Sequence, residues 1–321
     1  MNRRPLLALP LALCLPHTTR ADAYPDRIVR LIVPFPPGGA TDVTARLFAA
    51  AMTAAFDRSV VVDNRPGASG AVGIDQVAKS AADGYTLGVS GVGPTAILPQ
   101  IAPKLPYSPS RDLTIVAGLS AVDFILVARP SLPVANLAEL LAHAEANPGK
   151  VTYSSAGVAG PQQLMIEHLA MLSGVRVFHI PYTGDSQAIA AVASGDVDIA
   201  MAGAATSLGL IKSGKLKPLA ASSRRIPELP GLATVAERPG LEDFSGYTWN
   251  ILVAPKSTPM PVVARLNRVV NEIARQPAIA LKLEGLGLRP LIGDLNSITL
   301  LIDHEVAKYR RIIEATGIRR E

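Results

Sequence analysis

The chain has 321 residues, of which 49% are hydrophobic and 18% charged, a composition that predicts a globular protein long enough for two domains. Aromatic residues make up only 4% of the chain, which argues against the stacking platforms that bind nucleic acids. The formal net charge of +5 comes from scattered basic residues, so it indicates a mild preference for anions and no nucleic-acid partner.

The first 23 residues have the pattern of a cleavable export signal. Arg3 and Arg4 precede an apolar stretch (residues 6–15) that is too short to span a bilayer, and Ala-Asp-Ala at 21–23 fits a cleavage site. Cleavage after Ala23 also removes Cys14, the only cysteine, so the mature chain can form no disulfide. We therefore expect a soluble protein that is exported to the periplasm.

Strand-like and helix-like segments alternate along the rest of the chain. Strands are predicted over residues 28–33, 59–62, 85–89, 151–154, 175–180 and 197–201. The helices that follow them are predicted over residues 41–55, 70–80, 95–101, 161–173, 186–194 and 206–213. This alternation with short loops predicts an α/β fold with largely parallel sheets.

One pattern occurs twice, in "FILVARPSLPVANLAEL" (124–140) and in "NILVAPKSTPMPVVARL" (250–266). Each copy combines an apolar strand, a turn with proline and a helix. We interpret the two strands, near residues 123–127 and 251–254, as hinge crossover strands between two lobes. Lobe 1 then comprises residues 24–123 and 254–321, with C-terminal helices over 260–275, 277–286 and 298–315, and lobe 2 comprises residues 124–253. Two lobes on two hinge strands can close on a ligand by rotation.

All six predicted strand–helix pairs are joined by loops of small residues. In open α/β sheets such loops lie at the carboxyl ends of the strands, where ligands bind. Glycine lets backbone N–H groups approach a ligand, and helix N-termini add unpaired donors, so the loops predict an anion site. No lysine follows them as in a phosphate-binding loop, and neutral donors favour a small carboxylate over a nucleotide. The hydroxyl donors of these loops are Thr41, Ser69, Ser90, Thr95, Ser154, Ser155 and Thr183. Each loop taken alone also fits an ordinary glycine turn.

Signatures of catalysis or metal binding are missing. The sequence contains no G-x-S-x-G motif, and "HEVAK" at 304–308 lacks the second histidine of a zinc-binding helix. We therefore expect neither an enzyme nor a cofactor, and a periplasmic hydrolase is a weak alternative. Asp198 is interpreted either as a ligand contact or as a polar strand end, and Trp249 as a buried packing residue.

Several longer motifs together resemble the Bug family of periplasmic solute receptors for tripartite tricarboxylate transporters. They are "YPDRIVRLIVPFPPGGATDVTAR" (24–46), "VVDNRPGASGAVG" (61–73), "VTYSSAGVAGPQQL" (151–164) and "IPYTGDSQAIAAVASGDVDIAM" (180–201). The resemblance implies a two-lobed periplasmic binding protein of type II, the Venus-flytrap class, with a ligand held between the lobes. Its partners would be a small organic carboxylate, such as a dicarboxylate, amino acid or aromatic acid, and the membrane subunits of the transporter. A sensor kinase of a two-component system is the alternative partner, and we expect a monomer.

The resemblance also implies a set of ligand-contacting residues. They are Phe35, Gly38, Gly39, Thr41, Asp42, Ala68, Ser69, Gly70, Ser155, Ala156, Gly157, Tyr182 and Asp198, to which the donor loops add Ser90 and Thr95. The chain departs from the family at Ser69, where glycine is usual, and at Thr183, where lysine is frequent. These departures leave the identity of the carboxylate open.

Overall fold

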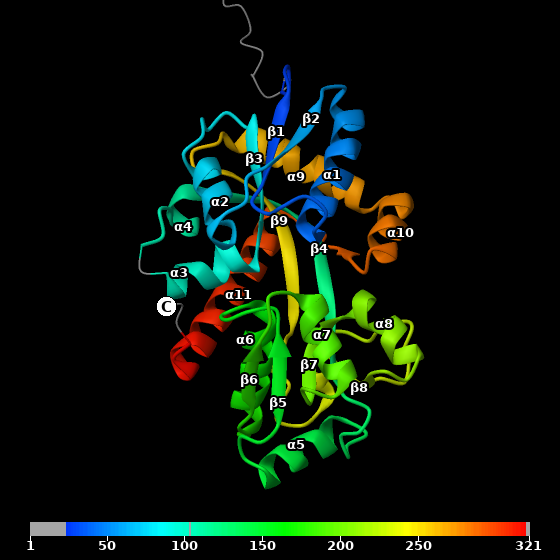
Figure 1. Ribbon diagram of the computed structural model, residues 1–321. Coiled ribbons are helices and arrows are strands. Elements are labelled where there is room, and N and C mark those ends of the chain that lie inside the picture. Colours follow the sequence, from blue (N-terminus) through cyan, green and yellow to red (C-terminus); the bar gives the residue numbers. More distant parts are fainter. Residues whose placement is uncertain (1–23, 103, 319–321) are drawn as a thin grey trace, which may run out of the picture.

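The computed structural model describes residues 24–102 and 104–318, which form two α/β lobes joined by long strands (Figure 1). The predicted export signal, with Cys14 and the cleavage point after Ala23, lies outside the described residues. Within the described ranges, no helix has both the length and the apolarity that a membrane span needs.

The first lobe is built on three parallel strands that alternate with helices. Its elements are β1 (Val29–Val33), α1 (Ala40–Phe56), β2 (Val60–Asn64), η1 (Ala68–Gly70), α2 (Ala71–Ala78), β3 (Thr86–Gly91), η2 (Gly93–Ile97), α3 (Leu98–Ile101) and α4 (Pro109–Asp112). β1 lies between β2 and β3, with Leu31 opposite Val62 and Leu87. Helices cover both faces of β1: Leu31 belongs to the same core cluster as Phe48 of α1, and Ile32 to the same cluster as Ile74 of α2. This double cover explains why the strand is a nearly continuous apolar run.

The second lobe repeats the strand–helix alternation. Its elements are α5 (Leu137–Ala146), β5 (Thr152–Ser155), α6 (Pro161–Ser173), β6 (Phe178–Pro181), α7 (Asp185–Ser194), β7 (Ile199–Gly203), α8 (Ala204–Lys212), β8 (Lys217–Ala221) and η3 (Val235–Glu237). β5 lies between β6 and β7 and runs parallel to both. Two apolar clusters fill the lobe, one that includes residues of α5 and α6 and one that includes residues of α7 and α8.

Two strands, β4 (Leu113–Ala128) and β9 (Tyr247–Pro255), join the lobes. β4 pairs with β9 from Leu113 to Asp123 and then, from Phe124 onward, with β7 and β8 of the second lobe. Both joining strands run antiparallel to the partners named, an arrangement that the strand–helix alternation did not predict. The lobe limits predicted after residues 123 and 253 stay a prediction, and the pairing of β9 from Tyr247 favours a return point nearer Gly246.

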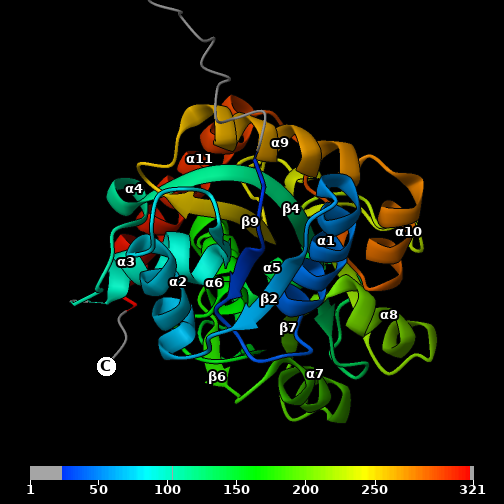
Figure 2. The same ribbon diagram turned by 90° about the horizontal axis from the view of Figure 1, so that it is seen from above.

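The C-terminal helices pack on the first lobe, close to their predicted ranges. They are α9 (Met260–Ala274), α10 (Pro277–Gly285) and α11 (Leu295–Thr316), with the short β10 (Arg289–Pro290) paired to β4. Seen from above, α9 and α11 lie on one side of the curved β4, and α1 and α2 lie on the other (Figure 2). Leu266 of α9 shares a core cluster with Phe48 of α1, whereas α11 also contacts α6 of the second lobe.

A buried carboxylate lies at the point where β4 changes its pairing partner. Asp123, whose side chain is 7% exposed, accepts hydrogen bonds from Arg224 Nε (2.6 Å), Arg289 Nε (3.1 Å to Oδ2) and Ser223 Oγ (2.8 Å). Arg289 belongs to β10 beside the first lobe, whereas Arg224 follows β8 of the second. Burial opposes ionisation, but the charges of Arg289 and Arg224 and their hydrogen bonds outweigh it and lower the pKa of Asp123.

We expect Asp123→Asn to lower the free energy of unfolding at pH 7 by about 2–3 kcal/mol, because it removes the acceptor charge between two arginines. The folded-state pKa lies below the unfolded value of about 3.9, so this contribution is complete above that pH and is lost as the pH falls through the folded pKa. Urea unfolding at pH 7 and at pH 3 measures both effects. Asp303→Asn, a change of an exposed carboxylate on α11, is the matched control, and equal stabilities of Asp123→Asn and this control at pH 7 would contradict the assignment.

Candidate functional site

The loops that follow β1, β2 and β3 meet at one edge of the first lobe, as their glycine content predicts. The three loops approach each other most closely around Gly70, which has a φ of +96°. A Cβ atom placed there would lie 2.7 Å from Pro94 Cγ and 3.2 Å from Phe35 Cζ. One glycine thus allows all three loops to pack together.

A hollow of about 230 Å³ lies between the two lobes at this edge. Phe35, Ala40, Thr41 and residues 91–94 line it from the first lobe, Val122, Phe124 and residues 248–250 from the joining strands, and Pro161 and Gln162 from the start of α6. Of the predicted contact residues, Phe35 and Thr41 line it directly. Within the described part of the chain, the lining includes no lysine, arginine, aspartate or glutamate.

The PPGG loop after β1 is held by a buried carboxylate. Asp42 is 2% exposed, and its Oδ2 accepts hydrogen bonds from Gly38 N and from Arg46 Nε, both at 2.9 Å. Its Oδ1 accepts one from Asn64 Nδ2 at 2.8 Å. Burial opposes ionisation, but these hydrogen bonds outweigh it and lower the pKa of Asp42. Asp42, predicted as a ligand contact, therefore braces the loop, and Gly38 supplies the donor at a φ of +91°.

A chain of polar side chains fixes the floor of the hollow. Thr41 Oγ1 donates to Asn250 Oδ1 (2.9 Å), Asn250 Nδ2 donates to Ser120 Oγ (3.0 Å), and Ser120 Oγ lies 2.9 Å from Thr44 Oγ1. Asn250 is only 5% exposed in an otherwise apolar strand. This polar residue within a buried run was a signal that the sequence analysis missed. Trp249 is 1% exposed, which agrees with its interpretation as a buried packing residue.

Two helices begin at the hollow, one from each lobe. α1 starts after Gly39 and α6 after Gly160, and in the described residues neither N-cap makes a side-chain hydrogen bond. The first amides of these helices therefore keep unpaired N–H groups, although Pro161 contributes none. The unpaired donors and the positive ends of two helix dipoles make the hollow favourable for an anion.

Other predicted residues of the first lobe lie behind the lining residues. Ser90 Oγ and Thr95 Oγ1 are 2.7 Å apart and buried, so they support residues 91–94 from within. Ala68 and Ser69 lie beside Gly70 in the left-handed region, with φ of +46° and +56°. Such a conformation costs about 1–3 kcal/mol for each non-glycine residue, and residues that adopt it cluster at functional sites.

The predicted residues of the second lobe gather in front of β5 and β6. Tyr182 N donates to Ser155 O (2.9 Å), and Tyr182 O lies 3.9 Å from the position of a Cβ on Gly157. Ser155 Oγ is 2.7 Å from His179 Nε2, and burial lowers the pKa of His179. Ser155, Ala156, Gly157 and Tyr182 are therefore neighbours, and the loop that begins at Ser155 leads to the residues of α6 that line the hollow.

Asp198 lies elsewhere. It precedes β7, whose amino end pairs with Ala128 at the far end of β4 and whose carboxyl end pairs with Phe124, where β4 enters the second lobe. Its Oδ1 accepts from Arg129 Nε (2.7 Å), and its Oδ2 accepts from Thr152 N (2.9 Å) and Thr152 Oγ1 (3.0 Å). Burial opposes ionisation, but these hydrogen bonds outweigh it and lower the pKa of Asp198. We therefore remove Asp198 from the proposed ligand contacts and assign it to joining β5, β7 and the end of β4.

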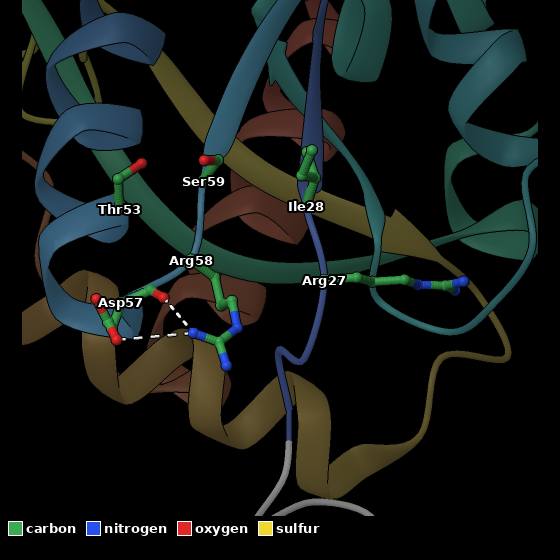
Figure 3. Close-up of a pocket in the computed structure, with 6 residues that line it drawn as sticks. All are labelled: Arg27, Ile28, Thr53, Asp57, Arg58 and Ser59. Carbon is green, nitrogen blue, oxygen red and sulfur yellow. Dashed lines mark hydrogen bonds and ion pairs between the residues drawn. The ribbon is translucent and has the colours of Figure 1, made fainter.

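A second hollow, of about 360 Å³, lies at the amino ends of β1 and β2, away from the glycine loops (Figure 3). Its two guanidinium groups have local partners: Arg58 Nη1 donates to Asp57 O (2.6 Å), and Arg27 Nη2 donates to Asp83 Oδ2 (2.8 Å). Figure 3 shows the Arg27 side chain extending away from Arg58. These exposed pairs do not converge on a ligand position. Among the described residues, no cluster of three or more histidine, cysteine, aspartate or glutamate side chains could hold a metal ion.

Comparisons with known proteins agree with this geometry. The model of the tripartite tricarboxylate transporter family receptor matches residues 44–318. Protein BugT of Bordetella pertussis (strain Tohama I) is 35% identical over 299 residues, 92% of this chain and 91% of BugT. The structure of R. palustris Rpa4515 with adipate has 31% identity and a TM-score of 0.77, and covers 92% of this chain and 99% of its own. MatC from Rhodopseudomonas palustris with bound malate has 30% identity and a TM-score of 0.72, and covers 90% of this chain and 100% of its own. The likeness confirms the predicted two-lobed α/β fold of periplasmic binding proteins.

The two glycines of the PPGG loop allow a matched test of its backbone. We expect Gly38→Ser to lower the free energy of unfolding by about 1–2 kcal/mol, because a side chain is unfavourable at a φ of +91°. Gly39→Ser should change it by less than about 0.5 kcal/mol, because Gly39 is an N-cap with an extended backbone and has open space around it. Thermal and urea unfolding measure the difference. Equal effects of the two substitutions would show that the left-handed residue does not constrain this loop.

Proposed function

Because this chain belongs to the family of tripartite tricarboxylate transporter receptors, we propose that it captures a small organic carboxylate between its two lobes. Members of this family are solute receptors and not enzymes. The observation that carries the proposal is the pair of uncapped helix N-termini, of α1 and α6, that face one hollow from opposite lobes. Rpa4515 with adipate and MatC with malate support a carboxylate as the ligand class.

The size and charge of the hollow support the same class. A volume of about 230 Å³ is small for a nucleotide and sufficient for an acid of a few carbon atoms. None of the described residues that line it carries a charged side chain, so a bound anion would be stabilised by amide dipoles and hydroxyl groups. Such neutral donors suit one or two carboxylate groups better than a polyphosphate.

We further infer export to the periplasm and transfer of the carboxylate to the membrane subunits of a tripartite tricarboxylate transporter. The Arg3–Arg4 pair and the apolar stretch that follows it support export, and the family supports the transporter as partner. N-terminal sequencing of the protein recovered from a periplasmic extract tests cleavage after Ala23. Recovery of a chain that still begins at Met1 from the cytoplasm would contradict export.

Calorimetry on ligand-stripped protein tests the ligand class. We expect saturable binding, with one site, for at least one acid in a panel of aliphatic dicarboxylates, hydroxy acids, amino acids and aromatic carboxylates. The ester of that acid in which every carboxylate is methylated has no anionic group to accept from the helix N-termini, so it should bind at least about tenfold more weakly. Failure of every acid to bind, with the protein shown to be folded, would contradict the proposal.

Thr41 allows a test of the hollow itself. Thr41→Val keeps the side-chain shape but removes the hydroxyl group that reaches Asn250, so we expect about a three- to tenfold loss of affinity for the bound acid. Thr299→Val on α11 is the control, because it removes a hydroxyl group of the same kind from a helix away from the hollow. Unchanged affinity in Thr41→Val would place the ligand elsewhere.

Closure of the lobes should follow binding, because a ligand that touches both lobes stabilises the arrangement in which both sets of contacts are made. We expect a smaller radius of gyration in small-angle scattering when the bound acid saturates the stripped protein. An identical scattering profile with and without the acid would contradict hinge closure while leaving binding itself intact.

A further inference from the structure

Three helices of the second lobe, α6, α7 and α8, begin on the side that faces the first lobe (Figure 1). Their first turns bring together Gln162, Asp185 and Thr206. Gln162 lines the hollow, and its Nε2 donates to Asp185 Oδ1 at 3.2 Å. Thr206 lies near Asp185, but its Oγ1 donates to Gly203 O at 3.0 Å. Asp185 itself does not line the hollow, and its carboxyl group contacts the hollow through Gln162.

Among the residues that the structure describes, none places an opposite charge in an ion pair with Asp185, in contrast to Asp42, Asp123 and Asp198. Burial raises the pKa of Asp185, and the hydrogen bond from Gln162 acts in the opposite direction. In its ionised form, the Asp185 carboxylate is a source of negative potential at the second-lobe end of the hollow, and no described residue forms an ion pair with it.

The same carboxylate determines which way the Gln162 amide points. An ionised carboxylate can only accept hydrogen bonds, so it holds the NH₂ group of the amide. The amide oxygen, Oε1, then accepts from no described residue, and it lies 3.9 Å from the position of a Cβ on Gly160. The second-lobe wall thus offers the Gln162 Oε1 acceptor beside the backbone donors of the α6 N-terminus, whereas the α1 N-terminus in the first lobe offers donors.

We propose that Asp185 is a specificity-determining residue that acts through Gln162 and selects monocarboxylates bearing a hydrogen-bond donor, an amine or a hydroxyl group, at the end that faces the second lobe. The carboxylate of such a ligand binds at the first lobe, and its donor meets Gln162 Oε1. A dicarboxylate of the same length brings a second negative charge to an acceptor and toward Asp185. This inference rests on the proposed carboxylate-binding function and narrows its ligand class.

The test compares ligands of equal length in the full protein after ligand stripping. The probes are the dicarboxylates of three to six carbons and the ω-hydroxy and ω-amino monocarboxylates of the same lengths, titrated by calorimetry. At the length that binds best, we expect the donor-bearing acid to bind at least tenfold more tightly than the dicarboxylate. Asp185→Asn should reduce this preference at least tenfold, mainly through tighter binding of the dicarboxylate.

Two further variants separate specificity from folding. Asp196→Asn changes an exposed carboxylate just beyond α7 and should leave the preference unchanged. Gln162→Met removes the acceptor at nearly constant volume and should weaken the donor-bearing acid alone. In the Gln162→Met variant, Asp185→Asn should then change the ratio of the two affinities less than Asp185→Asn does in the unmodified protein. If Asp185→Asn fails to fold, the result for Gln162→Met decides the question.

The inference is overturned if the unmodified protein binds the dicarboxylate as tightly as the donor-bearing acid. It is also overturned if Asp185→Asn, or Gln162→Met, changes the affinities for both acids by the same factor. Each of these outcomes would contradict the proposed preference for donor-bearing acids and would leave the proposed carboxylate binding unaffected. If no acid of either kind binds, and none of the wider panel binds, the proposed function itself fails.

Discussion

The hydrogen-bond ladders of β4 are the constraint on which the rest of the structure depends. This one strand pairs with β9 up to Asp123 and with β7 and β8 from Phe124, so the register of both lobes is set along a single backbone. Asp123 lies at the change of partner and accepts hydrogen bonds from arginines on both sides of it. Because the two lobes share this strand, the starts of α1 and α6 can face each other across one hollow.

The hollow combines a stiff backbone with an uncharged lining. Gly38 can take its left-handed conformation without steric cost, and Asp42 holds its N–H group in place. The Asp42 carboxylate is buried and forms an ion pair with Arg46, so it adds little net charge to the hollow. Binding of an anion can then depend on amides and helix dipoles, whose geometry is preorganised by the fold. Asp185, near the opposite wall, differs because it is a carboxylate that forms no ion pair with any described residue.

Local pattern predicted much of this molecule. The helices at 161–173 and 260–275 were predicted almost to the residue. In each, a proline marks the start of the helix, and the periodic run of apolar residues gives its length. Six glycine loops were predicted at the ends of strands, and three of them meet at Gly70, Pro94 and Phe35. Prediction failed for the start of β4 at Leu113 and for the antiparallel pairing of both joining strands, because pairing direction depends on distant partners. It also failed to separate bracing residues from lining residues, as Asp42, Ser90 and Thr95 illustrate.

By itself, the sequence determined the α/β alternation, the glycine loops, the repeated strand–turn–helix pattern and, through longer motifs, the family. These features are local, since they depend on residues within one strand, one loop or one helix turn. Only the tertiary structure decided that Thr41 contacts Asn250, 209 positions away, and that Gln162 contacts Asp185. It also decided that Asp198 braces the amino ends of strands rather than facing the hollow. The physical reason is that side chains distant in sequence meet through strand register and helix packing, which no local pattern encodes.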